Sequence, residues 1–193
     1  MGRATEALVM QRAVAELPVQ PARLADDREV LIRGAGSADL AGIIDFFERL
    51  STAARYFRFL SPQPRMRRAM VEQIVAPGPD RVTVLAQPVE FRDTARHVVA
   101  VGGWAYVARE DRCDISIAVA DAWQNVGLGT YVMLVLLQAA VACGQTRFAA
   151  EVLSSNMRML GLLRELGAPM RSRQEAGVVR VEFELPPMPR MTP

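Results

Sequence analysis

The chain has 193 residues, enough for one domain with a full hydrophobic core and too few for two domains of ordinary size. With 51% hydrophobic and 23% charged residues it has the composition of a globular protein, which excludes the disordered and fibrous classes. A formal net charge of +2 argues against a nucleic acid or another polyanion as the dominant partner. All 23 basic residues are arginine, so the chain contains no lysine.

Metal, disulfide and membrane sites are not expected either. His97 is the only histidine, and the spacing of Cys113 and Cys143 fits neither a metal motif nor a disulfide framework. Residues 127–143 are apolar, but the run is slightly short for a membrane span and contains polar residues, so we expect a buried helix there. Since no segment has the pattern of a signal peptide, we expect a cytoplasmic protein.

The first third of the chain is predicted to hold an appendage, a strand and two helices. Residues 1–28, which two prolines interrupt near their end, are expected to form an N-terminal arm. Residues 29–33 (EVLIR) favour a strand, and residues 39–50 have the apolar spacing of an amphipathic helix. Ser51 can cap a second helix that runs to residue 60 and is stopped by the prolines beyond it.

The remainder alternates strands and helices. Three runs rich in Val, Ile and aromatic residues, at 81–86, 97–108 and 113–120, predict an antiparallel meander. After it we expect a helix at 127–143, a strand at 147–152, a helix capped near Asn156 and ending at Gly167, a strand at 178–185 and a loose tail at 187–193. This order predicts an α/β fold built on a mixed sheet.

The most informative stretch, QNVGLG at residues 124–129, lies where a predicted strand meets the long helix. Glycines let the backbone turn tightly and approach a ligand, and the first N–H groups of a helix suit an anion such as pyrophosphate. Turn geometry alone would also explain two glycines before a helix. Other phosphate motifs fit worse, since a dinucleotide fingerprint needs glycine where Val132 stands and a P-loop needs a lysine that is absent.

The QxxGxG pattern between a strand and a helix resembles the acyl-CoA signature of the GNAT superfamily of N-acetyltransferases. The flanking segments IAVADAWQ and EVLSSNMRMLGLLRELG are similar to that family's fourth strand and to its fifth strand with the following helix. Residues 50–60 (LSTAARYFRFL) are similar to the start of GNAT domains in bacterial protein lysine acetyltransferases. The resemblance covers roughly residues 29–185. It implies one GNAT domain at 29–186, with a mixed, mostly antiparallel central sheet flanked by helices.

The resemblance implies transfer of acetyl from acetyl-CoA to a primary amine, without a metal. The acceptor, a protein lysine or a small molecule, is left open, as is the choice between monomer and homodimer. Loop N–H groups would hold the CoA pyrophosphate, and the end of the preceding strand would pair with the pantetheine arm. Asn156 would fix the pantetheine or the acceptor, or else serve only as a helix cap. The implied cofactor-binding residues are Ala118, Val119, Gln124, Asn125, Val126, Gly127, Leu128, Gly129, Thr130 and Asn156.

Asp114 is the predicted catalytic base. Strand alternation places it on one face with Ser116 and Ala118, and the protein-acetylating members of the family usually have Glu at this position. Asp is one methylene shorter, so a relayed water would help it reach the amine. A second departure is Leu163, which stands where many GNAT enzymes carry a Tyr that protonates the thiolate. Glu151 and Glu110 are the alternative acids.

Five arginines on and after the second predicted helix, Arg55, Arg58, Arg65, Arg67 and Arg68, form a local basic group. Such a group is either a solvated helix face or a surface for an acidic partner or for the 3′-phosphate of CoA. The weakened catalytic set also leaves an alternative function open. In that alternative the chain is a CoA-binding sensor or regulatory module with little catalytic activity.

Overall fold

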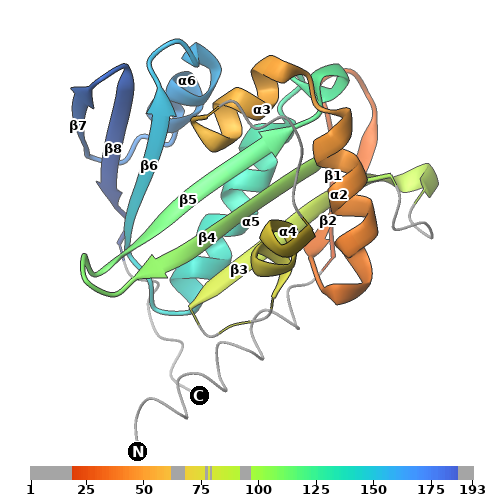
Figure 1. The fold of residues 1–193 in the computed structure, drawn as a ribbon, viewed down its shortest axis with the longest axis horizontal. Coiled ribbons are helices and arrows are strands. Elements are labelled where there is room, and N and C mark those ends of the chain that lie inside the picture. The colour runs from red at the N-terminus through yellow and green to blue at the C-terminus, as the bar shows by residue number, and fades with distance from the viewer. Residues whose placement is uncertain (1–18, 62–67, 77, 79, 92–96, 187–193) are drawn as a thin grey trace, which may run out of the picture.

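The computed structural model describes residues 19–61, 68–76, 78, 80–91 and 97–186. Within them one eight-stranded sheet runs in the order β1-β2-β3-β4-β5-β6-β8-β7 (Figure 1). The strands are β1 Gln20–Arg23, β2 Glu29–Gly34, β3 Arg81–Pro88, β4 Ala100–Val107, β5 Arg112–Val119, β6 Arg147–Leu153, β7 Met170–Glu175 and β8 Val178–Glu184. The α-helices are α2 Leu40–Arg49, α3 Thr52–Phe59, α4 Arg68–Val75, α5 Leu128–Ala142 and α6 Met157–Glu165, and the short 3-10 turns are η1 Ser37–Asp39, η2 Val89–Phe91 and η3 Asp121–Trp123.

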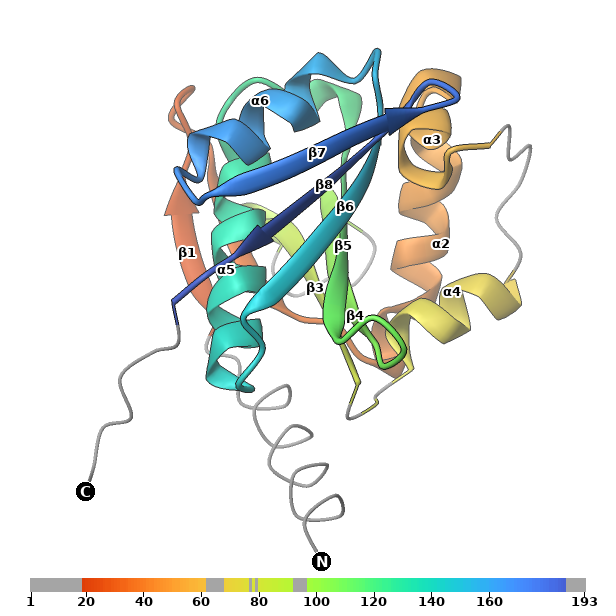
Figure 2. The ribbon, with the colours of Figure 1, turned by 90° about the vertical axis from the view of Figure 1, so that its left-hand side faces the viewer.

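The sheet is mostly antiparallel, and the pair β5–β6 is its parallel exception. Helices cover both faces, with α5 and α6 on one side and α2, α3 and α4 on the other (Figure 2). The side chains between them form two clusters. One joins α5 and α6 to the sheet, and the other joins α2 and α4 to Leu85, Val101 and Ala118. The predicted α/β fold with a mixed, mostly antiparallel sheet flanked by helices is confirmed.

Alternation along β5 follows the predicted pattern. Cys113 and Ile115 belong to the cluster under α5, whereas Ala118 belongs to the cluster under α2 and α4. Asp114 and Ser116 therefore lie on the same side of the sheet as α3. Burial raises the pKa of the Cys113 thiol to about 12, in keeping with a core side chain rather than a reactive one.

The structure adds elements that the sequence analysis did not place. Gln20–Arg23, part of the expected arm, pairs with β2 as the edge strand β1, where Pro21 fits because an edge strand leaves N–H positions unpaired. A third helix on that face, α4, begins at Arg68 and buries Val71 and Val75 one turn apart. Residues 1–18 and the tail at 187–193 lie outside the described residues. The boundaries of the arm and of the tail stay predictions.

Helix α5 packs directly over the middle of the sheet. Most of its side chains are buried, and no helix in the described ranges is long and apolar enough to cross a membrane. The close contact depends on Gly102 of β4, where an added Cβ would lie 2.7 Å from Val132 Cγ1 and 2.8 Å from Leu136 Cδ1. Both neighbours are completely buried, so neither side chain has space to retreat into.

We predict that Gly102→Ala lowers the free energy of unfolding by about 1–3 kcal/mol through overpacking. Gly36→Ala is the matched control, because the added Cβ would meet nothing within 4 Å there. Urea denaturation of both variants and the parent measures the difference. Equal stability of the two variants would show that α5 can move away from β4 without loss.

Candidate active site

Strands β5 and β6 pair over only two positions, Cys113 with Phe148 and Asp114 with Ala149. Beyond these pairs the strands diverge toward α3 and α6 (Figure 1). The divergence opens a slot in the middle of the sheet. A cavity of about 350 Å³ occupies its mouth, between α3, the end of β5, the 124–130 loop and α6, and a smaller one of about 30 Å³ lies deeper between β5 and β6.

The 124–130 loop has the backbone of an anion-binding turn. Asn125 and Gly127 both have left-handed conformations, with φ of 62° and 88°. Gly127 precedes α5, and the first turn-closing bond of the helix runs from Tyr131 N–H to Gly127 O. The N–H groups of Leu128, Gly129 and Thr130 thus precede the helical ladder and are the donors that a helix start offers to an anion.

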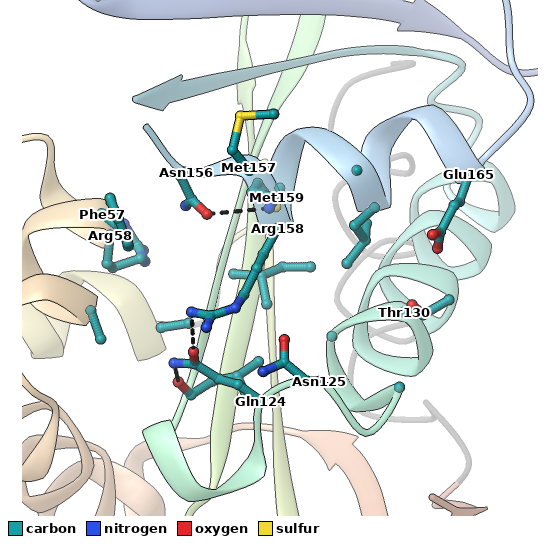
Figure 3. Close-up of a pocket in the computed structure, with 18 residues that line it drawn as sticks. Phe57, Arg58, Gln124, Asn125, Thr130, Asn156, Met157, Arg158, Met159 and Glu165 are labelled. Atoms are coloured by element: carbon teal, nitrogen blue, oxygen red, sulfur yellow. Dashed lines mark hydrogen bonds between the residues drawn. The ribbon is translucent and has the colours of Figure 1, made fainter. Parts of the chain in front are cut away.

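The side chains of this loop divide into two sets. Gln124, Asn125 and Thr130, with the backbone at Gly127 and Gly129, line the larger cavity (Figure 3). Val126 and Leu128 pack into the hydrophobic core instead, so only their main chain can serve a ligand. At Gly127 an added Cβ would meet nothing within 4 Å, which means that the space over the loop is open.

The end of β5 presents main-chain groups to the slot. Ala120 N–H donates a hydrogen bond to Val99 O, next to the start of β4, at 2.9 Å. In an antiparallel pair successive residues direct their N–H and C=O groups alternately toward and away from the partner strand. The N–H and C=O of Val119 therefore point away from β4 and into the slot. In agreement, Val119 O accepts a hydrogen bond at 3.0 Å from Gln124 Nε2 rather than from β4. Of the two strand residues predicted to face pantetheine, Val119 offers its main chain to the slot and Ala118 lines it from the α3 side.

Asn156 combines the two roles considered for it. Its Oδ1 accepts a hydrogen bond from Met159 N–H at 3.2 Å, which makes it the N-cap of α6. The same side chain lines both cavities, so its amide nitrogen is the group that it can offer to a ligand.

The predicted base, Asp114, lines neither cavity. Its side chain is 53% exposed and accepts a hydrogen bond from Arg112 Nε at 3.0 Å. Of the two alternative acids, Glu151 lines the smaller cavity, and its nearest cation is Arg180 at 3.7 Å. Glu110 is bound by Arg112 and Arg180, whose hydrogen bond lowers its pKa, and it lines neither cavity.

Helix α3 contributes Ala54 and Phe57, which the sequence analysis did not single out, and Arg58, a member of the predicted basic group. All three line the larger cavity, and Phe57 and Arg58 also line the smaller one. Arg58 is half-buried, its guanidinium lies over the Phe59 ring, and its buried Nε has no hydrogen-bond partner among the described residues. Burial lowers the pKa of Arg58 to about 10.

The start of α3 is tied to the turn before the loop. Asp121 accepts hydrogen bonds from Ser51 N–H at 3.0 Å and from Ser51 Oγ at 2.7 Å, while Ser51 Oγ caps the helix at Ala54 N–H. Burial acts to raise the pKa of Asp121, but the two bonds from Ser51 outweigh it, and the net shift is downward.

The helix α6 supplies a fourth side of the cavity through Arg158, Gly161, Leu162 and Glu165. These positions, like 54, 57 and 58 on α3, recur at helical spacing, a signal that could have identified one face of each helix from the sequence. Among the described residues no group of three or more His, Cys, Asp or Glu side chains is placed to hold a metal ion.

Comparison with known proteins shows which family the chain belongs to. A family model described as the acetyltransferase (GNAT) family matches residues 46–168. The chain belongs to this family. It is an acetyl-CoA-dependent N-acetyltransferase, and the slot, the anion-binding loop and the open space over Gly127 fit acetyl-CoA as its cosubstrate.

Individual relatives agree with the family. The acetyltransferase PA5475 of Pseudomonas aeruginosa is 28% identical over 148 residues, which cover 75% of this chain and 77% of that protein. The acetyltransferase Pat of Mycolicibacterium smegmatis is 36% identical over 75 residues, 39% of this chain and 22% of Pat. The GNAT domain of S. lividans PAT has a similar structure, with a TM-score of 0.77 and 26% identity over 86% of this chain and 97% of that domain. The match to Pat spans about a fifth of the length of Pat. The function of the whole Pat protein is therefore not assigned to this chain.

We predict that Gly127→Val abolishes acetyl-CoA binding but leaves the fold. A branched Cβ would fill the space over the loop, and a left-handed φ costs a residue other than glycine about 1–2 kcal/mol. Gly144→Val is the matched control, since Gly144 follows the other end of α5 with φ of 80° and equally open surroundings. Calorimetric titration should show binding in the control and none in Gly127→Val. Parental affinity in Gly127→Val would place the pyrophosphate elsewhere.

Proposed function

We propose that this GNAT enzyme acetylates the ε-amine of a lysine on a protein surface. The observation that carries the proposal is the slot itself, which has anion-binding N–H groups at its mouth and acidic side chains toward its deep end, on the face that α3 covers. The similarity of residues 50–60 to the start of protein-acetylating GNAT domains supports it, because α3 lies in this segment and lines the cavity. The similarity to the GNAT domain of S. lividans PAT supports it as well.

The acceptor must lose a proton before it attacks. A lysine amine has an ordinary pKa of about 10.4, so making it neutral at pH 7 costs roughly 4.6 kcal/mol. Asp114 remains our proposed proton acceptor, working through a water because its carboxylate lies outside the cavity linings. It shares the α3 face of β5 with Ser116, which lines the smaller cavity. Glu151 is the competing candidate, because it lines that cavity directly.

The other polar steps fall to the main chain and to solvent. The Val119 peptide group faces the slot, and its N–H is the proposed donor to the thioester oxygen as negative charge develops there. Leu163, at the position of the usual Tyr, is 1% exposed and packs in the core. No side chain at that position can protonate the leaving thiolate, so we propose that the proton comes from water.

The second candidate function is an acyl-CoA sensor with little turnover. Leu163 in the core and Asp114 outside the cavities are the observations that favour it. Thiol release from acetyl-CoA, measured with a panel of lysine peptides and polyamines, tests both functions. Since the chain contains no lysine, its own side-chain amines cannot contribute to the signal. Binding of acetyl-CoA without transfer to any acceptor would favour the sensor.

We predict that Asp114→Asn keeps acetyl-CoA binding and lowers single-turnover transfer by about 10²-fold to 10⁴-fold, the usual contribution of a general base. Asp114→Glu should retain activity, because it extends the carboxylate by one methylene. Glu151→Gln is the matched isosteric control and is expected to retain most of the rate. Transfer at saturating acetyl-CoA across pH measures all three. A parental rate in Asp114→Asn with a large loss in Glu151→Gln would assign the base to Glu151.

We predict that Arg58 selects acceptors with an acidic residue beside the lysine, because its buried Nε has no partner in the described residues. Arg58→Gln should raise the KM for an Asp-flanked lysine peptide about tenfold more than for an Ala-flanked one. Arg68→Gln serves as the control, since Arg68 is exposed and paired with Glu72 on α4. An equal loss of affinity for acetyl-CoA and for both peptides would instead place Arg58 at the cosubstrate.

A further inference from the structure

Two hydrogen bonds link β5 to α6 across the slot. Gln124 Nε2 donates to Val119 O at 3.0 Å, and Arg158 Nη1 donates to Gln124 Oε1 at 2.9 Å. Figure 3 shows Arg158 reaching down from α6 to meet Gln124 beside Asn125. We call these three groups the Gln124 latch: the Val119 carbonyl, the Gln124 amide and the Arg158 guanidinium.

The latch uses a main-chain group that a ligand in the slot needs. Val119 points its peptide groups away from β4, and β6 has already diverged, so partners of Val119 O come from a side chain, from water or from a ligand. In this structure the Gln124 amide fills that role. An amide N–H of pantetheine lying along β5 would offer Val119 O the same kind of bond. A carbonyl oxygen can accept two hydrogen bonds, but both donors would reach this one through the slot, so the two amides compete for the same space.

The cation at the other end of the latch has a neutral hydrogen-bond partner. Within the described residues Arg158 forms no ion pair within 4 Å, and the Gln124 amide is its one hydrogen-bond acceptor. The carboxylate of Asp121 is near enough for the charge of Arg158 to help lower its pKa, after the larger effect of the two hydrogen bonds from Ser51. Other arginines, such as Arg112 and Arg180, are bound by carboxylates. Arg158 is exposed, lines the larger cavity and contacts the first residue of the anion-binding loop. A phosphate at that loop would be a much stronger partner, because both groups of the new bond would be charged.

We propose that Arg158 is a phosphate ligand of acetyl-CoA, and that binding exchanges the latch for cosubstrate contacts. Arg158 leaves Gln124 Oε1 for a phosphate oxygen, and Gln124 Nε2 leaves Val119 O to a pantetheine N–H. Each group that loses a bond at the slot wall gains one from the ligand, except the Gln124 amide, which turns to water. The proposal rests on the acetyl-CoA dependence of the family and is independent of the acceptor.

Titration calorimetry of the full chain tests the phosphate contact. Arg158→Gln removes the charge, and Arg164→Gln is the control, since Arg164 is exposed on the same helix and lines neither cavity. We expect Arg158→Gln to raise the Kd for CoA about 10-fold to 100-fold, and Arg164→Gln to leave it unchanged. The salt dependence of the Kd should weaken in the same variant. Pantetheine, which has no phosphate, should bind parent and variant alike.

3′-Dephospho-CoA separates the two phosphate sources. If its Kd is the same for parent and Arg158→Gln, the contact is to the 3′-phosphate, and if it rises as for CoA, the contact is to the pyrophosphate. Parental affinity for CoA in Arg158→Gln, or an equal loss for pantetheine, would overturn the phosphate assignment. Both readouts are binding constants, so they stand even if transfer to lysine fails.

Association kinetics test the exchange at Val119. Gln124→Ala removes the competing amide, so pantetheine and CoA should both associate faster than with the parent. Stopped-flow tryptophan fluorescence measures the rate, because Trp123 is adjacent to Gln124, and Trp104→Phe in both proteins leaves Trp123 as the one fluorescent tryptophan. Urea denaturation of the variant confirms that the loop change has not unfolded the protein. An unchanged or slower association rate in a folded Gln124→Ala would overturn the latch.

Discussion

The early end of the β5–β6 pairing is the constraint on which the site depends. After Asp114 and Ala149 the two strands no longer bond to each other, so a stretch of strand edge is exposed inside the sheet. Peptide groups on such an edge need partners, and at the half-buried Val119 the Gln124 side chain supplies one. The same unpaired edge is what an extended amide-containing ligand can use. Under the proposed binding mode, pantetheine would add as a short strand to this open edge of the sheet.

The two ends of β5 differ in charge. At its mouth the first turn of α5 directs N–H groups outward, and Arg158 stands beside them. At the opposite end of β5, the buried Arg112 binds Glu110, Asp114 and Glu182. Of these acids Asp114 is the proposed base, working through a water from outside the cavity linings, while Glu151 of β6 lines the smaller cavity. The positive and negative ends are separated by the length of β5, which keeps the phosphate and ammonium sites from interfering with each other.

The sequence predicts the parts of this arrangement that come from local patterns. The QxxGxG stretch, the alternation along β5 and the helical spacing of α2, α5 and α6 predict the central strands, the helices around them and the loop. Edge strands β1 and β7 were missed because they are short, proline-containing or polar and lack alternation. Arg158 was missed for another reason. Arg58 was predicted as part of a basic group, whereas Arg158 is an ordinary helix residue in the sequence, and only the tertiary fold turns both toward one cavity.

Two hydrogen bonds from Ser51 to Asp121 connect two elements that line the larger cavity or lead into it. They fasten the start of α3 to η3, the turn that leads directly into the loop at Gln124. Helix α3 has no fully buried residue, and its Ala54 and Phe59 side chains pack against the second hydrophobic cluster. The two bonds from Ser51 therefore add a polar anchor at the first turn of a lightly packed helix that lines the larger cavity. Through them one serine and one aspartate hold the cavity wall on α3 to the turn that leads into the glycine loop.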